Sequence, residues 1–168
     1  MVEHAIRTEP ALLGIYLNDH FAGASGGVDL ARRLAGSHRD SAAGRELERI
    51  AAETAEDRDS LRQIMADLEV KPQRYKAMAA SVAEKLGRLK LNGRLLRHSP
   101  LSSVIELEAM RLGVEGKAAG WRTLRMVAED DPRLDAEQLD WLIARAREQA
   151  DTLEELRVRA LADALVAG

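Results

Sequence analysis

Four long stretches of this 168-residue chain repeat apolar residues every three or four positions, which is the period of an α-helix. They run over about 10–35, 41–68, 99–128 and 135–166. The loops inside the first pair and inside the second pair are short, so each pair should form an antiparallel hairpin. No stretch shows the sustained alternation of apolar and polar residues that indicates a strand. The sequence therefore predicts an all-α fold.

The segment between the second and third stretches predicts how the two hairpins are joined. It is about 30 residues long, enough to return along a four-helix bundle as a crossover. Pro72 disfavours a helical Lys71, and Gly93 in "LNGR" suits a helix end, so a short fifth helix is expected over about 73–89. We expect a four-helix bundle with one long crossover, forming a single domain over 1–168.

Charge and composition argue against several classes of function. The formal net charge is −3 with acids and bases interspersed, whereas nucleic-acid binding needs a concentrated basic face. The chain has no cysteine, which excludes disulfides and thiolate metal sites. An early acid in "MVEHAIRTEPALLG" and the lack of a long apolar run predict neither a signal peptide nor a membrane span. The expected location is the cytoplasm.

The segment "AAETAEDRDSLRQIM" (51–65) carries four acids on one expected helix. At about 100° per residue, Asp57 falls inside the apolar stripe, Glu53 lies at its edge, and Glu56 and Asp59 lie outside it. A solvated face accounts for the last three. A carboxylate in the apolar stripe is costly without a partner, so Asp57 is expected to have one.

Each of the other long helices also places a polar residue on its apolar face near mid-length. These residues are His20, Gln149 and, if the charged line from Glu108 to Arg122 faces solvent, Lys117. His20 and Asp57 are nearly equidistant from the first hairpin turn, so we expect them to meet in one layer of the bundle. The predicted mid-bundle polar network consists of Tyr16, His20, Thr54, Asp57, Lys117 and Gln149.

Small residues form a ridge along the third long helix. Ala109, Gly113, Gly116 and Gly120 recur at spacings of four, three and four, and the first helix contains "AGASGG" over 22–27. Such residues allow another helix to approach closely. The ridge is consistent with internal packing or with the interface of a homodimer, and the sequence leaves both open.

The bundle expected from "LLGIYLNDHF" to "AREQADTLEELR" resembles the ferritin-like superfamily over nearly the whole chain. The metal-binding members of that superfamily hold a di-iron or di-manganese centre with mid-bundle carboxylates and two Glu-x-x-His motifs. The resemblance would place these motifs at Thr54 with Asp57 and at Ala146 with Gln149, and a further Glu at about Tyr16. Neither motif is present here. The resemblance therefore implies the fold and a degenerate site without a di-metal centre.

Three interpretations of function follow. The first is a non-catalytic binding or scaffold protein in which Lys117 supplies the positive charge that metal would bring. The second is a metalloprotein or oxidoreductase with a single Zn, Mn or Fe ion on His20, Glu53, Asp57 and Glu106. The third is a regulator that acts through the basic segment 71–98. A purely structural alternative is also open, in which Lys117 extends to the surface and His20 bonds a backbone group.

Overall fold

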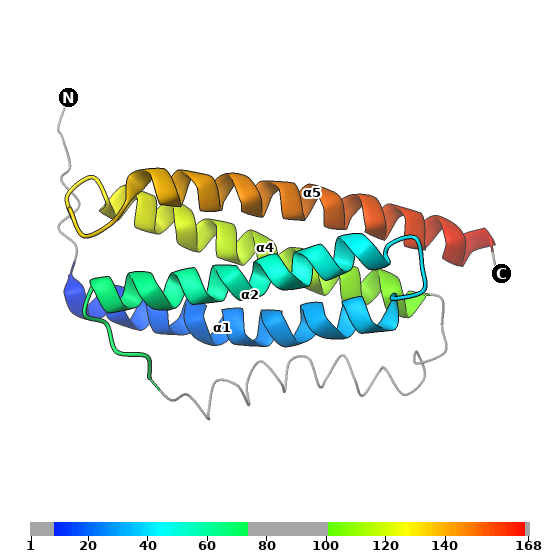
Figure 1. Ribbon diagram of the computed structural model, residues 1–168, viewed down its shortest axis with the longest axis horizontal. Coiled ribbons are helices and arrows are strands. Elements are labelled where there is room, and N and C mark those ends of the chain that lie inside the picture. The colour runs from blue at the N-terminus through cyan, green and yellow to red at the C-terminus, as the bar shows by residue number, and fades with distance from the viewer. Residues whose placement is uncertain (1–8, 74–100, 167–168) are drawn as a thin grey trace.

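A computed structural model describes residues 9–73 and 101–166, and within them four helices lie side by side (Figure 1). These are α1 (Pro10–Ser37), α2 (Gly44–Asp67), α4 (Leu101–Val127) and α5 (Ala136–Val166). No strand occurs in these described ranges, which confirms the all-α prediction. The expected helix bounds agree with the observed ones to within three residues. Nearly all of the expected fifth helix over 73–89 lies outside the described residues.

The helix ends follow from local chemistry. Asp135 caps α5, and its carboxylate accepts hydrogen bonds from the backbone N–H groups of Glu137 (2.9 Å) and Gln138 (3.2 Å). At the start of α2, a Cβ on Gly44 would lie 2.7 Å from the carbonyl oxygen of Arg39, so the tight turn requires glycine. Glu69 follows α2 with a φ of 58°, and this left-handed residue ends the helix.

The helices form a ring in which α1 neighbours α2 and α4, and α5 neighbours the same two helices. Side-chain bonds fix the direction of α4 relative to α1: Tyr16 contacts Thr123 and His38 contacts Ser103, so the two helices are antiparallel. Since α1 and α2 form a hairpin, α2 and α4 run in the same direction on opposite corners of the ring. The crossover that would join them remains a prediction, because residues 74–100 lie outside the described ranges.

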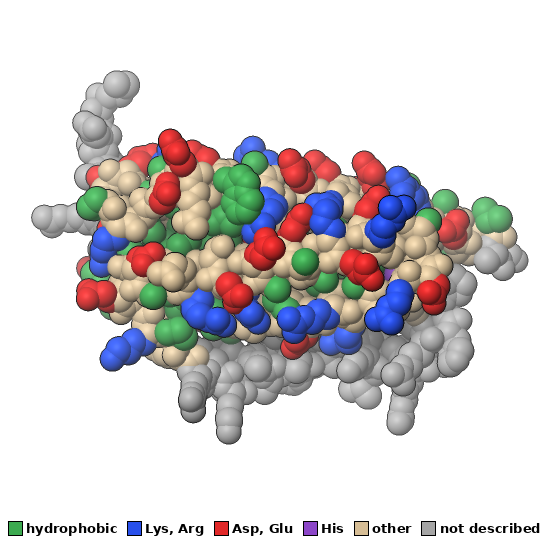
Figure 2. Space-filling view, in the orientation of Figure 1, with side chains coloured by type: hydrophobic (Ala, Val, Ile, Leu, Met, Phe, Trp, Pro, Cys, Tyr) green, Lys and Arg blue, Asp and Glu red, His purple; other side chains and the backbone are tan. Residues whose placement is uncertain are grey.

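The core is almost entirely aliphatic. Leucine dominates it, and Trp121 is its one fully buried aromatic side chain within the described residues, at 2% exposure. Burying each large aliphatic side chain contributes about 1.5–3 kcal/mol, so the packed stripes hold the four helices together. Among the described helices, none combines the length and the apolar character needed to cross a bilayer. Figure 2 shows acidic and basic side chains interspersed on the visible face.

Candidate functional site

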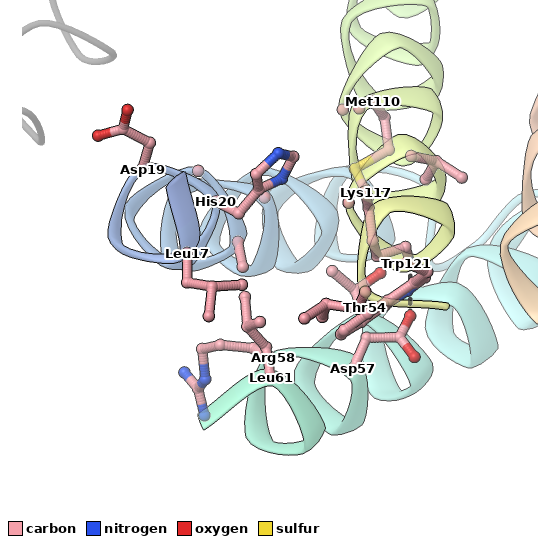
Figure 3. Close-up of a pocket in the computed structure, with 18 residues that line it drawn as sticks. Leu17, Asp19, His20, Thr54, Asp57, Arg58, Leu61, Met110, Lys117 and Trp121 are labelled. Atoms are coloured by element: carbon pink, nitrogen blue, oxygen red, sulfur yellow. Dashed lines mark hydrogen bonds and ion pairs between the residues drawn. The ribbon is translucent and has the colours of Figure 1, made fainter. Parts of the chain in front are cut away.

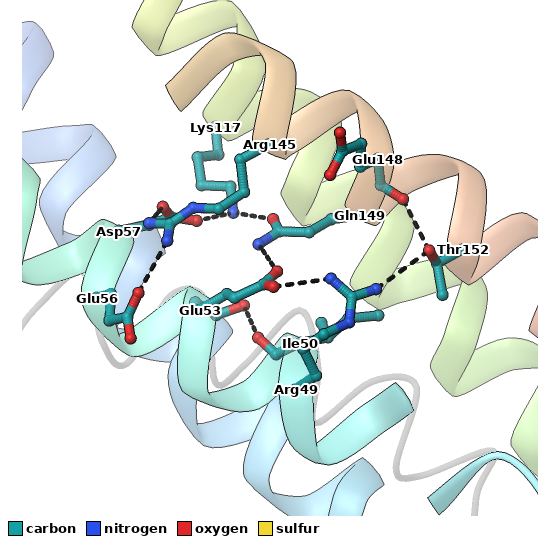
Figure 4. A network of polar contacts seen from close by, with 11 residues as sticks. Arg49, Ile50, Glu53, Glu56, Asp57, Lys117, Arg145, Glu148, Gln149 and Thr152 are labelled. Atoms are coloured by element: carbon teal, nitrogen blue, oxygen red, sulfur yellow. Dashed lines mark hydrogen bonds and ion pairs between the residues drawn. The ribbon is translucent and has the colours of Figure 1, made fainter. Parts of the chain in front are cut away.

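Seven polar side chains form a continuous chain of contacts across the middle of the bundle (Figure 4). We call this chain the polar network. Each member bonds the next, from an exposed arginine on α2, through the buried interior, to an exposed acid on the same helix. In order, the members are Arg49, Glu53, Gln149, Lys117, Asp57, Arg145 and Glu56.

Asp57 is the central anion of the polar network, and only 2% of it is exposed. Its Oδ2 accepts a hydrogen bond from the Lys117 ammonium of α4, and its Oδ1 accepts one from the Arg145 guanidinium of α5. A carboxylate removed from water is stable only with such charged partners. The predicted need of Asp57 for a partner is therefore met twice, by two different helices.

Lys117 crosses the centre of the bundle from α4 toward the opposite helix α2. It also donates to the amide oxygen of Gln149, and the Gln149 amide nitrogen donates to Glu53 at 2.8 Å. Gln149 is fully buried, so both ends of its amide need these partners. Burial lowers the pKa of Lys117, while the negative charge of Asp57 acts in the opposite direction.

Arg145 is a member of the polar network that the sequence analysis missed. Its guanidinium carbon lies 4.1 Å from the ring centroid of Trp141, and one of its N–H groups donates to Glu56 at 2.8 Å. Only 10% of the Arg145 side chain is exposed. The signal was present in the sequence, because Trp141, Arg145 and Gln149 are spaced four residues apart on one face of a helix. An arginine held under an aromatic ring can reach inward with its planar donors.

The polar network is balanced in charge. Its three cations are Arg49, Lys117 and Arg145, and its three anions are Glu53, Glu56 and Asp57. Each buried anion is engaged by donors from the protein itself. Among the described residues, every carboxylate of the polar network is thus already engaged by donors of the protein.

Three of the predicted members lie outside the polar network. Thr54 donates to the Ile50 carbonyl of its own helix at 2.6 Å, and the Tyr16 hydroxyl shares a hydrogen bond with Thr123. His20 packs against Tyr16, with ring centroids 4.4 Å apart. Within the described residues, His20 does not bond Asp57, and Figure 3 shows the two side chains well apart.

His20 points toward α4 and not toward Asp57 (Figure 3). The imidazole turns toward α4 and lies over Gly120, where a Cβ would come within 3.0 Å of its Nδ1. The equal distance of the two residues from the hairpin turn predicts their level along the bundle axis. It does not predict the direction in which the His20 side chain points. The predicted pairing is thus replaced by a contact between a ring and a glycine.

The residues suggested as metal ligands are not gathered into one site. In residues 9–73 and 101–166, no group of three or more His, Asp or Glu side chains is placed to hold a metal ion. Asp57 and Glu53 bond to donors of the protein, and Glu106 is exposed. His20 packs against Tyr16 and over Gly120 instead.

A cavity of about 340 Å³ lies between α1 and α4, with α2 forming its third side (Figure 3). Its walls are mainly apolar, and five glycines line it: Gly23, Gly27, Gly113, Gly116 and Gly120. A Cβ on Gly113 or Gly116 would meet nothing within 4 Å. Among the three glycines of the predicted small-residue ridge, only Gly120 has a described side chain packed closely against it, and Gly113 and Gly116 open onto the cavity.

His20 and Trp121 also line this cavity, and both carry polar atoms. The Trp121 Nε1 is buried without a hydrogen-bond partner among the described residues. Desolvation lowers the pKa of His20, and the nearby charge of Asp19 acts in the opposite direction. Burial in the cavity wall therefore favours the neutral form of the imidazole.

Comparisons with known proteins identify no relative of this chain. No protein-family model, no curated protein and no solved structure matches it. The features of this chain that bear on function are therefore the geometry of the polar network and of the cavity.

Proposed function

We propose that this chain is a cytoplasmic, non-catalytic binding or scaffold protein with a ferritin-like four-helix architecture and a long crossover. In this proposal the polar network occupies the mid-bundle layer where metal-binding members of that superfamily hold a di-metal centre. The observation that carries the proposal is the double engagement of Asp57. Lys117 and Arg145 each bond one of its two carboxylate oxygens, so protein cations supply the charge that metal ions would bring.

The chemistry of the donor set supports the same conclusion. Iron, manganese and zinc sites in proteins use carboxylate and imidazole ligands that are free to coordinate. Here Asp57 and Glu53 are bonded to other side chains, and His20 lies elsewhere. A metal ion would have to displace Lys117 from Asp57, leaving an ammonium group without its anion in a desolvated position.

Metal analysis tests the proposal directly. Protein purified without added metal, and then equilibrated with Mn²⁺, Fe²⁺ or Zn²⁺, is expected to retain much less than one equivalent after gel filtration. Stoichiometric metal would contradict the proposal and favour the metalloprotein interpretation with His20, Glu53, Asp57 and Glu106.

A charge-reversal variant sharpens this test. Lys117→Glu would place a third carboxylate beside Asp57 and Glu53, so it is expected to bind Mn²⁺ more tightly than the wild type. Arg122→Glu makes the same change in net charge at an exposed position of α4 and serves as the matched control. Equal Mn²⁺ binding by the two variants would show that Lys117 does not take the place of a metal ion.

A further inference from the structure

His38 and Ser103 form a hydrogen-bonded pair between the end of α1 and the start of α4, away from the polar network. The Nε2 of His38 lies 3.1 Å from the Oγ of Ser103, and its Nδ1 lies 3.0 Å from the carbonyl oxygen of Leu34. Both side chains are half-buried, so the protein holds the pair in place while solvent still reaches it. A serine hydroxyl beside a histidine that a third group orients is the arrangement of an activated nucleophile.

The contact with Leu34 determines which ring nitrogen of His38 is the base. A carbonyl oxygen only accepts hydrogen bonds, so the neutral imidazole carries its hydrogen on Nδ1 and donates it to Leu34. The other nitrogen, Nε2, then presents its lone pair to Ser103. The Ser103 hydroxyl therefore donates to Nε2, which is the direction required for His38 to take the proton.

Three other serines have hydroxyl contacts of a different kind. Ser25, Ser37 and Ser41 each donate to a backbone carbonyl oxygen, at 3.0, 2.9 and 2.7 Å. A carbonyl oxygen does not take up a proton near neutral pH, whereas an imidazole, with an ordinary pKa of about 6.5, does so readily. The partner of its hydroxyl thus distinguishes Ser103 from these three serines.

The positions of the two residues in their helices favour proton transfer from Ser103 to His38. His38 is the C-cap of α1, where the helix dipole places partial negative charge that stabilises an imidazolium. Ser103 is the third residue of α4, where the dipole places partial positive charge that stabilises an alkoxide. Within the described ranges, the last turn of α1 has no basic residue and the first turn of α4 has no acidic one. The charged residues next in sequence, Arg39, Asp40 and Glu106, are exposed, and solvent screens them.

We infer that Ser103, with His38 as its base, is a nucleophilic serine that accepts one acyl group from an activated carboxylic ester. The Oγ of Ser103 bonds to the acyl carbon, the ester C–O bond breaks, and the leaving group departs with that electron pair. The hydroxyl proton passes to Nε2 of His38 and then to solvent. The product is an O-acylated chain, and no catalytic turnover is required. The inference uses neither the polar network nor the cavity, so it goes beyond the proposed function and is tested separately from metal binding.

Acetylation by p-nitrophenyl acetate at about pH 8, where an ordinary imidazole is neutral, tests the inference on the wild-type protein. Peptide mass spectrometry over a time course gives the rate at each serine. We expect Ser103 to be acetylated about 100-fold faster than Ser37, although Ser37 is the more exposed, because a general base contributes about 10²–10⁴-fold. Equal rates at the two serines would overturn the inference and leave the pair as a structural contact between α1 and α4.

Two histidine variants test the role of His38. His38→Gln removes the base but keeps a side chain able to hydrogen-bond, and it should slow acetylation of Ser103 to about the rate at Ser37. His20→Gln is the matched control, because it removes another half-buried histidine, one that packs against Tyr16 rather than against a serine. It should leave the rate at Ser103 unchanged. An undiminished rate at Ser103 in His38→Gln would overturn the inference.

Nitrogen-15 NMR of the His38 ring in the wild-type protein tests the tautomer without any variant. At about pH 8 we expect the ring hydrogen on Nδ1, because that nitrogen faces the Leu34 carbonyl oxygen. A hydrogen on Nε2 would show that His38 donates to Ser103 and cannot accept its proton. That result would overturn the inference even if the variants failed to fold.

Discussion

Two neighbouring helix pairs lie on opposite sides of the bundle, α2 with α5 and α1 with α4, and we call the contact within each pair a seam. The two seams are built from opposite kinds of side chain. Between α2 and α5, long charged and polar side chains bridge the gap, including Arg145 to Asp57 and Gln149 to Glu53. Between α1 and α4, glycines from both helices line a cavity of about 340 Å³. One seam is filled by large polar groups that satisfy each other, and the other is left open by the smallest residues. The same bundle thus closes one helix pair with long polar side chains and leaves space between the other.

The comparison predicts that the α2–α5 seam is the more sensitive to mutation. Asp57→Ala removes the shared anion of Lys117 and Arg145 and leaves two cations with little access to water. We expect it to lower the free energy of unfolding by about 3–5 kcal/mol. Urea denaturation followed by circular dichroism measures this value.

Asp59→Ala is the matched control for Asp57→Ala. It removes a carboxylate from the same helix, but Asp59 is 55% exposed. A change within about 0.5 kcal/mol is expected for such a surface position. Equal effects of the two variants would contradict the idea that burial distinguishes the polar network from an ordinary charged surface.

The sequence alone predicted the four long helices and the inward position of Asp57. Both depend on the period of one helix, which the residues of that helix determine. Lys117 and Gln149 were also placed correctly, because each interrupts or adjoins an apolar stripe on its own helix. The structure brings these three together as the predicted mid-bundle layer requires.

The sequence could not predict which residues pair across helices. The direction of His20 depends on the space over Gly120, and that space depends on the distance between α1 and α4. Arg145 was missed because its partner is on another helix and its shielding ring, Trp141, lies on the surface. Which side chains pair depends on how the helices pack against one another. The apolar pattern of a single helix gives no information on that packing.

In the α1–α4 seam, a small added side chain should raise the free energy of unfolding, whereas Asp57→Ala in the other seam should lower it. Gly113→Ala introduces a methyl group where nothing lies within 4 Å, so the better helix propensity of alanine should stabilise the protein by about 0.5–1 kcal/mol. Gly120→Ala gains the same propensity but places its methyl group 3.0 Å from the His20 ring. It should therefore be less stable than Gly113→Ala. Thermal denaturation compares the two, and equal stabilities would show that the His20 ring moves aside at no cost.

The smallest effect is expected from His20, through the pH dependence of stability. Burial lowers its pKa in the folded protein below the ordinary value of 6.5, so the unfolded chain binds more protons just below pH 6.5. The contribution of the neutral ring is fully present above pH 6.5 and is lost as the pH falls through 6.5 toward the lowered pKa. Asp19, whose charge opposes the shift, keeps this loss small.

His20→Gln isolates this contribution, because glutamine does not titrate. Wild type and variant should show the same pH dependence of the unfolding free energy above pH 7, and the variant should show the shallower decline between about pH 6.5 and 5. The exposed acids with lowered pKa, Asp59 and Glu154, titrate at lower pH and are common to both proteins. Identical slopes would mean that the imidazole is as well solvated when folded as when unfolded. The α1–α4 seam would then be wet around His20, and the contrast between the two seams would lie in charge alone.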